Sequence, residues 1–313
     1  MSDYDDVCVL LPTMDEAATV GDVVSASREA GFETVLVVDG GSDDDTREIA
    51  RSAGARVVRQ SGRGKGQAVR EGVEKIEEPY VLMADGDGTY RPVDADVMLQ
   101  PLFDGRAEHV IGDRFADMEA GAMTRLNAVG NRLINRAFAT VHGRDLKDIL
   151  SGYRAFTRES FDRFRLKADG FGIETELAVE CVRNGVSTAV VPIRYEARPG
   201  GSETNLHPVK DGGRIFLTLY RLARMNNPIF YFGSVALIGT LIGIAIGGFV
   251  GYEYFVRGIS REVMALLSAF FILLSVQLLM FGVLSDIIVS VNREQSRRLE
   301  AITERLEDLD RDD

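Results

Sequence analysis

Residues 81–91 read VLMADGDGTYR, an apolar run that ends in Asp85-Gly86-Asp87. In an extended backbone, residues two apart point to the same side, so both carboxylates should project together just past a buried strand. Two convergent carboxylates suit a hard divalent cation, which usually carries phosphate oxygens as its other ligands. An Asp-x-Asp taken alone is more often a solvated turn or a structural cap. The surrounding sequence therefore has to decide between these interpretations.

The sequence before this motif alternates apolar strands with amphipathic helices. The pattern predicts strands at 7–11, 34–38, 56–59 and 80–83, and helices at 19–30, 44–53 and 66–75. This order predicts an α/β domain with a mostly parallel, Rossmann-like sheet. Ligands of such sheets bind beyond the carboxyl ends of the strands. We therefore expect three polar segments to gather at one edge, namely residues 12–16, 39–42 and 85–87.

Residues 92–200 are less regular. They contain predicted helices at 125–139 and 174–184, and a predicted strand at 188–193. Arg114 follows the apolar residues 110–112, and further arginines lie among turns that contain Gly and Ser. Arginines often serve only as surface charge, but near a phosphate they form bidentate clamps.

The composition narrows the class of protein. The net charge is -12, with 48 acidic against 36 basic residues, which argues against a nucleic-acid partner. An acidic, lysine-poor chain suits either a protein of high-salt environments or an ordinary acidic cytosolic enzyme. Cys8 and Cys181 lie in apolar patterns and are predicted to be core residues. The 3 scattered histidines argue against a histidine metal site.

Two long uncharged runs, 226–252 and 263–285, follow the α/β region. Each is long enough to cross a bilayer, so we predict transmembrane helices at about 227–252 and 263–289. The preceding segment 208–226 places basic residues among apolar ones, which is typical of a helix lying on a membrane surface. Basic residues before the first span and after the second favour the cytoplasmic side, although the link also carries two arginines.

This pattern predicts a multi-pass cell-membrane protein with a helical hairpin. The N-terminus has no signal peptide, so the first domain and both termini are expected in the cytoplasm. The predicted parts are a domain at 1–207, a juxtamembrane helix at 208–226, the hairpin at 227–289 and a charged tail at 290–313.

Two further features bear on the ligand. Asp39 ends a predicted strand, where its carboxylate could accept hydrogen bonds from a base or a ribose hydroxyl. The turn at 62–66, GRGKG, precedes a helix and would offer N–H groups to an anion, with Lys65 as a candidate nucleotide-sugar-binding residue. The turn is not a Walker A loop, because Gly66 stands where Ser or Thr is needed, and its spacing fails the G-x-G-x-x-G pattern.

The motifs occur in an order that resembles family 2 glycosyltransferases of the GT-A fold. They read LPTMDEAATV, VVDGGSDDDT, GKGQAVREG, MADGDGTYRP, IGDRF, LSGYRAF, GFGIETEL and VPIRYEARPGGSETNL, and cover roughly residues 5–210. The set is most similar to polyprenyl-phosphate glycosyltransferases, and with the acidic composition to haloarchaeal dolichol-phosphate hexosyltransferases of N-glycosylation. The predicted domain at 1–207 would then be a GT-A glycosyltransferase domain.

The resemblance implies roles for individual residues. On the donor side, Pro12, Thr13 and Glu16 would contact the nucleotide, Asp39 the base, and Asp85 the nucleotide side of the Asp-x-Asp. Asp87 would bind Mg²⁺ or Mn²⁺ directly, with Asp85, and Thr89 stands where the family often has a second metal ligand, Gln. The acceptor-phosphate set would be Arg114, Arg125, Arg198 and Ser202, with Asp87, Arg114 and Arg198 catalytic. The serine that usually follows the family arginine near Arg125 is absent.

The expected reaction is metal-dependent, inverting transfer of a hexose from a nucleotide diphospho-sugar to dolichyl (polyprenyl) phosphate. A phosphate acceptor is already ionised near pH 7 and needs no strong general base, which agrees with motifs that contain no His. UDP-glucose is the favoured donor through the haloarchaeal likeness, and GDP-mannose is the alternative. A processive synthase is disfavoured because the chain has no Trp. A membrane scaffold that binds nucleotide sugar without turnover also stays open.

Overall fold

The computed structural model describes residues 4–168, 170, 172–198 and 228–311, with residues 141, 228 and 292–311 as backbone only. The chain divides into two compact units, residues 1–219 and 220–313. The predicted surface helix at 208–226 lies outside the described residues, as does Ser202.

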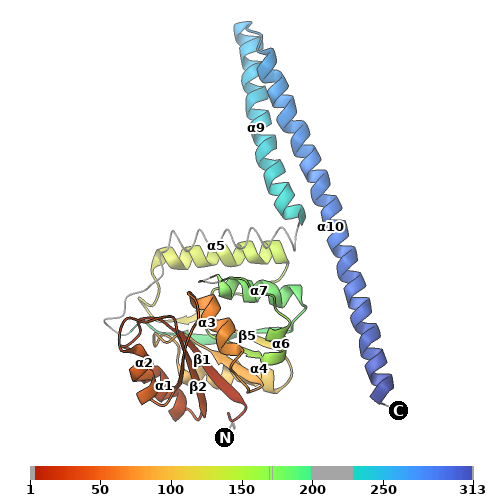
Figure 1. The fold of residues 1–313 in the computed structure, drawn as a ribbon. Coiled ribbons are helices and arrows are strands. Elements are labelled where there is room, and N and C mark those ends of the chain that lie inside the picture. The colour runs from red at the N-terminus through yellow and green to blue at the C-terminus, as the bar shows by residue number, and fades with distance from the viewer. Residues whose placement is uncertain (1–3, 169, 171, 199–227, 312–313) are drawn as a thin grey trace. The chain divides into compact units, whose positions relative to one another are not determined.

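A seven-stranded sheet runs through the first unit (Figure 1). Its strands are β1 (Val7–Thr13), β2 (Thr34–Asp39), β3 (Arg56–Arg59), β4 (Tyr80–Met83), β5 (His109–Met118), β6 (Arg154–Thr157) and β7 (Thr188–Tyr195). The spatial order is β3-β2-β1-β4-β6-β5-β7. Strands β3, β2, β1 and β4 are parallel, as are β5 and β7, whereas β6 is antiparallel to both of its neighbours. The predicted α/β class with a mostly parallel sheet is confirmed.

Helices cover both faces of this sheet. They are α1 (Val20–Glu29), α2 (Thr46–Ser52), α3 (Lys65–Val73), α4 (Ala95–Phe103), α5 (Arg125–His142), α6 (Arg158–Asp162) and α7 (Ile173–Arg183), with a 3₁₀ turn at Pro92–Asp94. The helices predicted at 19–30, 44–53 and 66–75 are present with ends displaced by one or two residues, a range within which helix termini fray.

Alternation along β1 divides the apolar core into two layers. Val7, Val9 and Leu11 face a layer that includes side chains of α1, α2 and α4. Cys8 and Leu10 face the other layer, which α3, α6 and α7 complete. Both cysteines are buried free thiols, so the prediction that they are core residues is confirmed. Burial raises the pKa of Cys8 and of Cys181 to about 12, which keeps both thiols protonated and unreactive.

Strand β5 is longer than its apolar sequence indicates. It continues well past the predicted apolar residues 110–112, and its pairing with β7 shifts register between Asp113 and Asp117. Arg114 therefore lies inside the strand at a bulge, and not after the strand as predicted. A bulge redirects the side chains next to it and is common beside binding sites.

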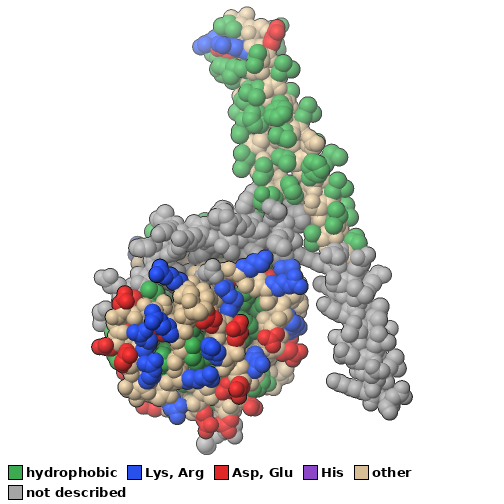
Figure 2. Space-filling model, in the orientation of Figure 1, with side chains coloured by type: hydrophobic (Ala, Val, Ile, Leu, Met, Phe, Trp, Pro, Cys, Tyr) green, Lys and Arg blue, Asp and Glu red, His purple; other side chains and the backbone are tan. Residues whose placement is uncertain are grey.

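The second unit consists of helices α9 (Pro228–Arg257) and α10 (Glu262–Arg311). Their segments Ile229–Arg257 and Glu262–Val291 are long and apolar enough to cross a membrane. Hydrophobic side chains are spread along the described part of both helices in this view, and charged side chains gather at one end (Figure 2). The two helices pack closely. The Ser268 hydroxyl donates to the Gly243 carbonyl at 2.7 Å, and a Cβ at Gly243 would lie only 2.7 Å from the Ile272 side chain.

The boundaries of the hairpin differ from the prediction. The link expected at 253–262 is mostly helical, since α9 continues to Arg257. The helix can continue because Glu253 is buried and accepts hydrogen bonds from Arg257 (2.8 Å) and Arg261 (3.2 Å), which neutralise its charge. The charged tail at 290–313 was predicted to be an amphipathic helix from residue 294, and it is helical as far as Arg311, where it continues α10 without a break.

Candidate active site

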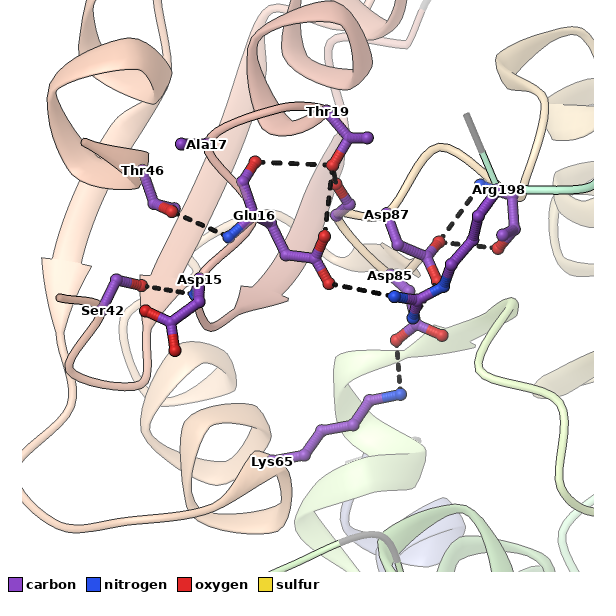
Figure 3. Close-up of polar contacts among 12 residues, drawn as sticks. Asp15, Glu16, Ala17, Thr19, Ser42, Thr46, Lys65, Asp85, Asp87 and Arg198 are labelled. Carbon is purple, nitrogen blue, oxygen red and sulfur yellow. Dashed lines mark hydrogen bonds and ion pairs between the residues drawn. The ribbon is translucent and has the colours of Figure 1, made fainter. Parts of the chain in front are cut away.

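The polar segments that follow β1, β2 and β4 meet at one edge of the sheet, as predicted (Figure 3). The Gly40 amide donates to the Thr13 carbonyl at 2.8 Å, which joins the first two segments. The Thr19 hydroxyl donates to the Gly86 carbonyl at 2.8 Å, which joins the first to the third. A Cβ at Gly86 would lie 2.4 Å from the Thr13 methyl group, so only glycine allows this approach.

The loop after β1 is fixed by side chains of the loop after β2 and of the first residue of α2. Ser42 and Thr46 accept hydrogen bonds from the backbone amides of Asp15 and Glu16, both at 2.9 Å. Asp15 has a positive φ of 56°, which its hydrogen bonds to this loop stabilise. These contacts set the direction of the Glu16 side chain, whose carboxylate lies near Thr19.

Asp39 is fully buried at the end of β2. Its carboxylate accepts hydrogen bonds from the amides of Gly41 (3.1 Å) and Ser42 (3.2 Å), and Arg47 lies 3.6 Å away. The carboxylate thus shapes the loop after β2. We predicted that Asp39 contacts the base of the nucleotide. The hydrogen bonds that Asp39 makes within the chain do not test this contact, which stays a prediction.

Asp87 lies between a hydroxyl and a guanidinium. Thr89 donates to Asp87 Oδ1 through its hydroxyl (2.7 Å) and its amide (3.1 Å). Arg198 Nη2 lies 2.7 Å from Asp87 Oδ2, and Arg198 Nη1 lies 3.7 Å from Glu16 (Figure 3). Burial and the neighbouring Asp85 raise the pKa of Asp87, while Arg198 and Thr89 lower it in part. Here Thr89 orients Asp87.

Asp85 belongs to a second cluster of charges, which is partly buried. Lys65 Nζ lies 2.5 Å from Asp85 Oδ1 and 2.6 Å from Glu174 Oε1. Burial alone would lower the pKa of Lys65, but the two carboxylates raise it above its usual range. Lys65 is therefore charged and holds the carboxyl end of β4 to the N-terminus of α7. Glu174 was not among the predicted site residues, because a lone Glu at a helix start resembles an ordinary N-terminal acid.

Arg114 is buried in a bidentate pair with Asp148. Its Nε and Nη2 atoms donate to the two carboxylate oxygens at 2.6 and 2.9 Å. The guanidinium carbon also lies 5.4 Å from the centre of the Tyr195 ring. Burial opposes the charge, but Asp148 and Tyr90 raise the pKa of Arg114 above its usual range. The expected phosphate-binding arginine is thus a permanent, preoriented cation.

The loop before β6 brings backbone close to Asp85. Arg154 is fully buried and donates to the carbonyls of Ile149 (2.7 Å), Ser151 (3.0 Å) and Glu174 (2.9 Å). It lies at the start of β6 and supports this loop. A Cβ at Gly152 would lie 2.6 Å from Asp85 Oδ2, so a side chain there would displace either the loop or the Asp85 carboxylate. The Gly152 amide donates to the Tyr90 hydroxyl at 3.1 Å.

The site suits a divalent cation that binds together with a diphosphate-bearing molecule. Within the described residues no three Asp, Glu, His or Cys side chains are grouped to hold a metal. Asp85 and Asp87 supply carboxylate oxygens, and a cation there would complete its coordination with diphosphate oxygens and water. The buried hydroxyl of Thr13 has no hydrogen-bond partner in the described part of the chain, which leaves a polar group for a bound molecule.

The remaining predicted residues lie elsewhere. Pro12 is buried in β1, where its ring precedes the loop that carries Glu16. Arg125 is the exposed first residue of α5, and no described contact joins it to Asp87 or Arg114. Ser202 cannot be placed because it lies outside the described residues.

Comparisons with known proteins agree with this geometry. Residues 8–165 match the model of glycosyl transferase family 2. Glycosyltransferase AglJ of Haloferax volcanii is 62% identical over 95% of this chain and 98% of its own length. A dolichyl-phosphate hexose transferase of the same organism is 35% identical over 68% of this chain and 91% of its own length.

Solved structures share the fold. The structure of glucosyl-3-phosphoglycerate synthase from Mycobacterium tuberculosis with Mn²⁺, UDP and glucosyl-3-phosphoglycerate has a TM-score of 0.58 and 23% identity. The match covers 69% of this chain and 79% of that one. This likeness supports a GT-A-like sheet, while the sequence matches supply the family. The chain is a glycosyltransferase of family 2, related to the dolichyl-phosphate sugar transferases.

Proposed function

We propose that this chain transfers a hexose, with inversion, from a nucleotide diphospho-sugar to dolichyl (polyprenyl) phosphate, using Mg²⁺ or Mn²⁺. The observation that carries the proposal is that the carboxylates at the site are paired with Lys or Arg side chains. Asp87 and Glu16 face Arg198, Asp85 and Glu174 face Lys65, and Asp148 faces Arg114. Each is engaged with a cation and therefore poorly suited to remove a proton.

The state of these carboxylates favours a phosphate acceptor over a hydroxyl acceptor. A hydroxyl must lose its proton to a base, whereas a phosphate monoester carries an ionised oxygen near pH 7. His109 is no substitute base, because burial and the nearby Arg154 lower its pKa well below the usual range and it lies in the core. An acceptor oxygen would form a bond to the anomeric carbon while the bond to the diphosphate breaks. An α-linked donor would then give a β-linked lipid phosphate.

The chain's own charges would stabilise the leaving diphosphate. A divalent cation held by Asp87, with Asp85, would offset the negative charge that develops there. Arg198 would exchange its carboxylate partners for phosphate oxygens, which a guanidinium binds equally well. Arg114, held by Asp148, would present a fixed positive charge to the acceptor phosphate at no reorganisation cost. The Thr13 hydroxyl and Asp39 would contact the nucleotide.

The apolar helices would hold the enzyme where its acceptor is found. A polyprenyl phosphate keeps its phosphate at the bilayer surface, and α9 and α10 are long enough to anchor the chain there. A two-span hairpin places both of its ends on one side of the membrane. We place that side, with the catalytic domain and both termini, in the cytoplasm.

A donor series tests the proposal and names the sugar. Membranes that contain the full chain receive dolichyl phosphate, Mg²⁺ and high salt with radiolabelled UDP-glucose, GDP-mannose or UDP-N-acetylglucosamine separately. One donor, UDP-glucose on this proposal, should label a lipid that mild acid releases. If only GDP-mannose labels the lipid, the transferred sugar is mannose, and the proposed type of reaction is unchanged. No labelled lipid from any donor, with donor binding intact, would favour a scaffold that binds nucleotide sugar.

A further inference from the structure

Tyr195 is a half-buried aromatic residue of the site to which the proposed reaction assigns no role. It ends β7 beside β5, and the guanidinium carbon of Arg114 lies over its ring, 5.4 Å from the ring centre. This distance is within the range of a cation–π interaction. The rings of Tyr195 and Tyr90 have their centres 5.5 Å apart, and Tyr90 stacks on Tyr153 at 5.0 Å. Because Tyr90 and Tyr153 are buried, they hold the Tyr195 ring in place.

Asp148 and Tyr195 together limit the direction in which Arg114 can bind a ligand. A guanidinium group carries five N–H donors. Asp148 accepts one from Nε and one from Nη2, along one edge of the group. The Tyr195 ring prevents the guanidinium from swinging to its own side. Among the described residues Nη1 has no acceptor, so its two N–H groups are left for a phosphate of the ligand.

The hydroxyl of Tyr195 lies close to the carboxylate that we assign to the metal. It is hydrogen-bonded to the Thr89 side chain, and the Glu196 amide next to it donates to the Thr89 carbonyl at 3.1 Å. The Thr89 hydroxyl donates its single hydrogen to Asp87 at 2.7 Å, so Tyr195 is the donor to Thr89. Burial raises the pKa of Tyr195, Arg114 lowers it in part, and the charge of Asp87 raises it again. The hydroxyl therefore stays protonated and can donate.

We propose that Tyr195 is a positioning residue, which orients Arg114 toward the acceptor phosphate and fixes its distance from Asp87. The ring sets the direction of the guanidinium, and the hydroxyl connects the ring through Thr89 to the carboxylate that would hold the cation. Tyr195 thus keeps the acceptor phosphate in line with the bond that breaks at the diphosphate. This role rests on the proposed function, in which Arg114 binds the acceptor phosphate.

Two variants separate the ring of Tyr195 from its hydroxyl. The full chain in membranes receives labelled donor, Mg²⁺ and a series of dolichyl phosphate concentrations. Tyr195→Leu removes the ring, so the KM for dolichyl phosphate should rise about fivefold as the cation–π contact is lost. Tyr195→Phe keeps the ring and should restore the wild-type KM for dolichyl phosphate. Its kcat should fall about threefold, because the hydrogen bond to Thr89 is gone.

Tyr80→Leu is the matched control. It removes a partly buried ring that contacts Phe103, at the start of β4 and away from the site. Both of its kinetic constants should equal those of the wild type. The KM for the donor should be the same in all these proteins, which shows that the nucleotide side of the site is intact.

The outcomes separate the role of Tyr195 from the reaction itself. If the wild type transfers sugar and Tyr195→Leu keeps its acceptor KM, the ring does not position Arg114. If Tyr195→Phe raises the acceptor KM as much as Tyr195→Leu does, the ring is not the part that acts. If Tyr195→Leu also loses donor binding, Tyr195→Phe decides, and a wild-type kcat in that variant would overturn the role. A wild type that labels no polyprenyl phosphate would overturn the proposed function, and the role of Tyr195 with it.

Discussion

Arg198 Nη2 lies 2.7 Å from Oδ2 of Asp87, so the carboxylate that we assign to a divalent cation is already paired with a cation of the chain itself. Asp87 is nearly buried, while the Arg198 side chain is partly exposed. Arg198 and a metal ion would therefore compete for one carboxylate. We therefore expect the pairing of Arg198 with Asp87 to lower the affinity of the site for a metal ion.

Replacing Arg198 with Gln should tighten Mn²⁺ binding in the absence of nucleotide. The ion pair no longer has to open, which is worth about 1 kcal/mol for a partly exposed pair, or a severalfold change in Kd. Mn²⁺ titration followed by electron paramagnetic resonance measures the effect. Arg194→Gln, at an exposed residue near Asp117 and Glu196, is the matched control. Equal or weaker binding by the Arg198 variant would show that no competition exists.

Replacing Asp87 with Asn should abolish Mn²⁺ binding and strongly reduce transfer. The variant keeps the size of the side chain but loses the charge that faces the cation, and loss of one such electrostatic contact lowers turnover by about 100- to 1000-fold. Asp104→Asn, at an exposed residue paired with Arg106, should leave both unchanged. Full activity of the Asp87 variant would refute the metal assignment.

Removing the charge of Lys65 should destabilise the first unit. Lys65→Met leaves Asp85 and Glu174 as unpaired, partly buried carboxylates, which costs about 3–5 kcal/mol for a buried pair. Lys65→Met combined with Glu174→Gln should recover part of that loss, because one of the two unpaired charges is gone. Lys147→Met, at an exposed pair with Asp145, is the control. Thermal melts of the wild type and these three variants decide, and a double variant no more stable than Lys65→Met would contradict the coupling.

Adding a methyl group at Gly152 should impair transfer more than folding. The new Cβ would lie 2.6 Å from Asp85 Oδ2, so either the loop before β6 or the Asp85 carboxylate must move. Gly130→Ala is the matched control, because nothing lies within 4 Å of its Cβ and it sits inside a helix. We expect at least a tenfold loss of turnover for Gly152→Ala, about 1.4 kcal/mol. The control should be as active as the wild type.

The stability of the first unit should fall in mild acid because of His109. Burial, with a contribution from Arg154, lowers the pKa of His109 in the folded protein, whereas in the unfolded chain it is about 6.5. Below pH 6.5 the unfolded state binds a proton that the folded state does not. The free energy of unfolding should therefore decrease by up to about 1.4 kcal/mol per pH unit.

His109→Gln isolates this effect from the titration of other groups. Melting temperatures of wild type and variant, measured from pH 7 to pH 5, should converge as the pH falls. Parallel curves would mean that His109 does not titrate differently in the two states.

Periodicity predicted the first half of the fold because β1, β2 and β4 are apolar runs bounded by turns. It also located Asp39, Asp85 and Asp87, since residues after parallel strands share an edge. Strand β6 was not predicted, because it is short and begins with a buried Arg154. That arginine donates to carbonyls of the preceding loop and to the Glu174 carbonyl, 20 residues further along the chain.

The same limit applies to the partners within the site. Asp148 pairs with Arg114 across 34 residues, and Glu174 reaches Lys65 through the packing of α7. No local pattern contains such pairings. Leu126, Val129 and Leu133 of α5 have helical spacing and are exposed, because spacing alone does not tell which side of a helix faces the domain.

The central claim is that the nucleophile is a phosphate oxygen of a polyprenyl phosphate. The most direct measurement supplies the full chain with labelled donor, Mg²⁺ and, in parallel, dolichyl phosphate or free dolichol. The account predicts a β-linked, acid-labile lipid product from dolichyl phosphate and none from dolichol. Transfer to the dolichol hydroxyl, or no lipid product while donor binding is intact, would contradict it.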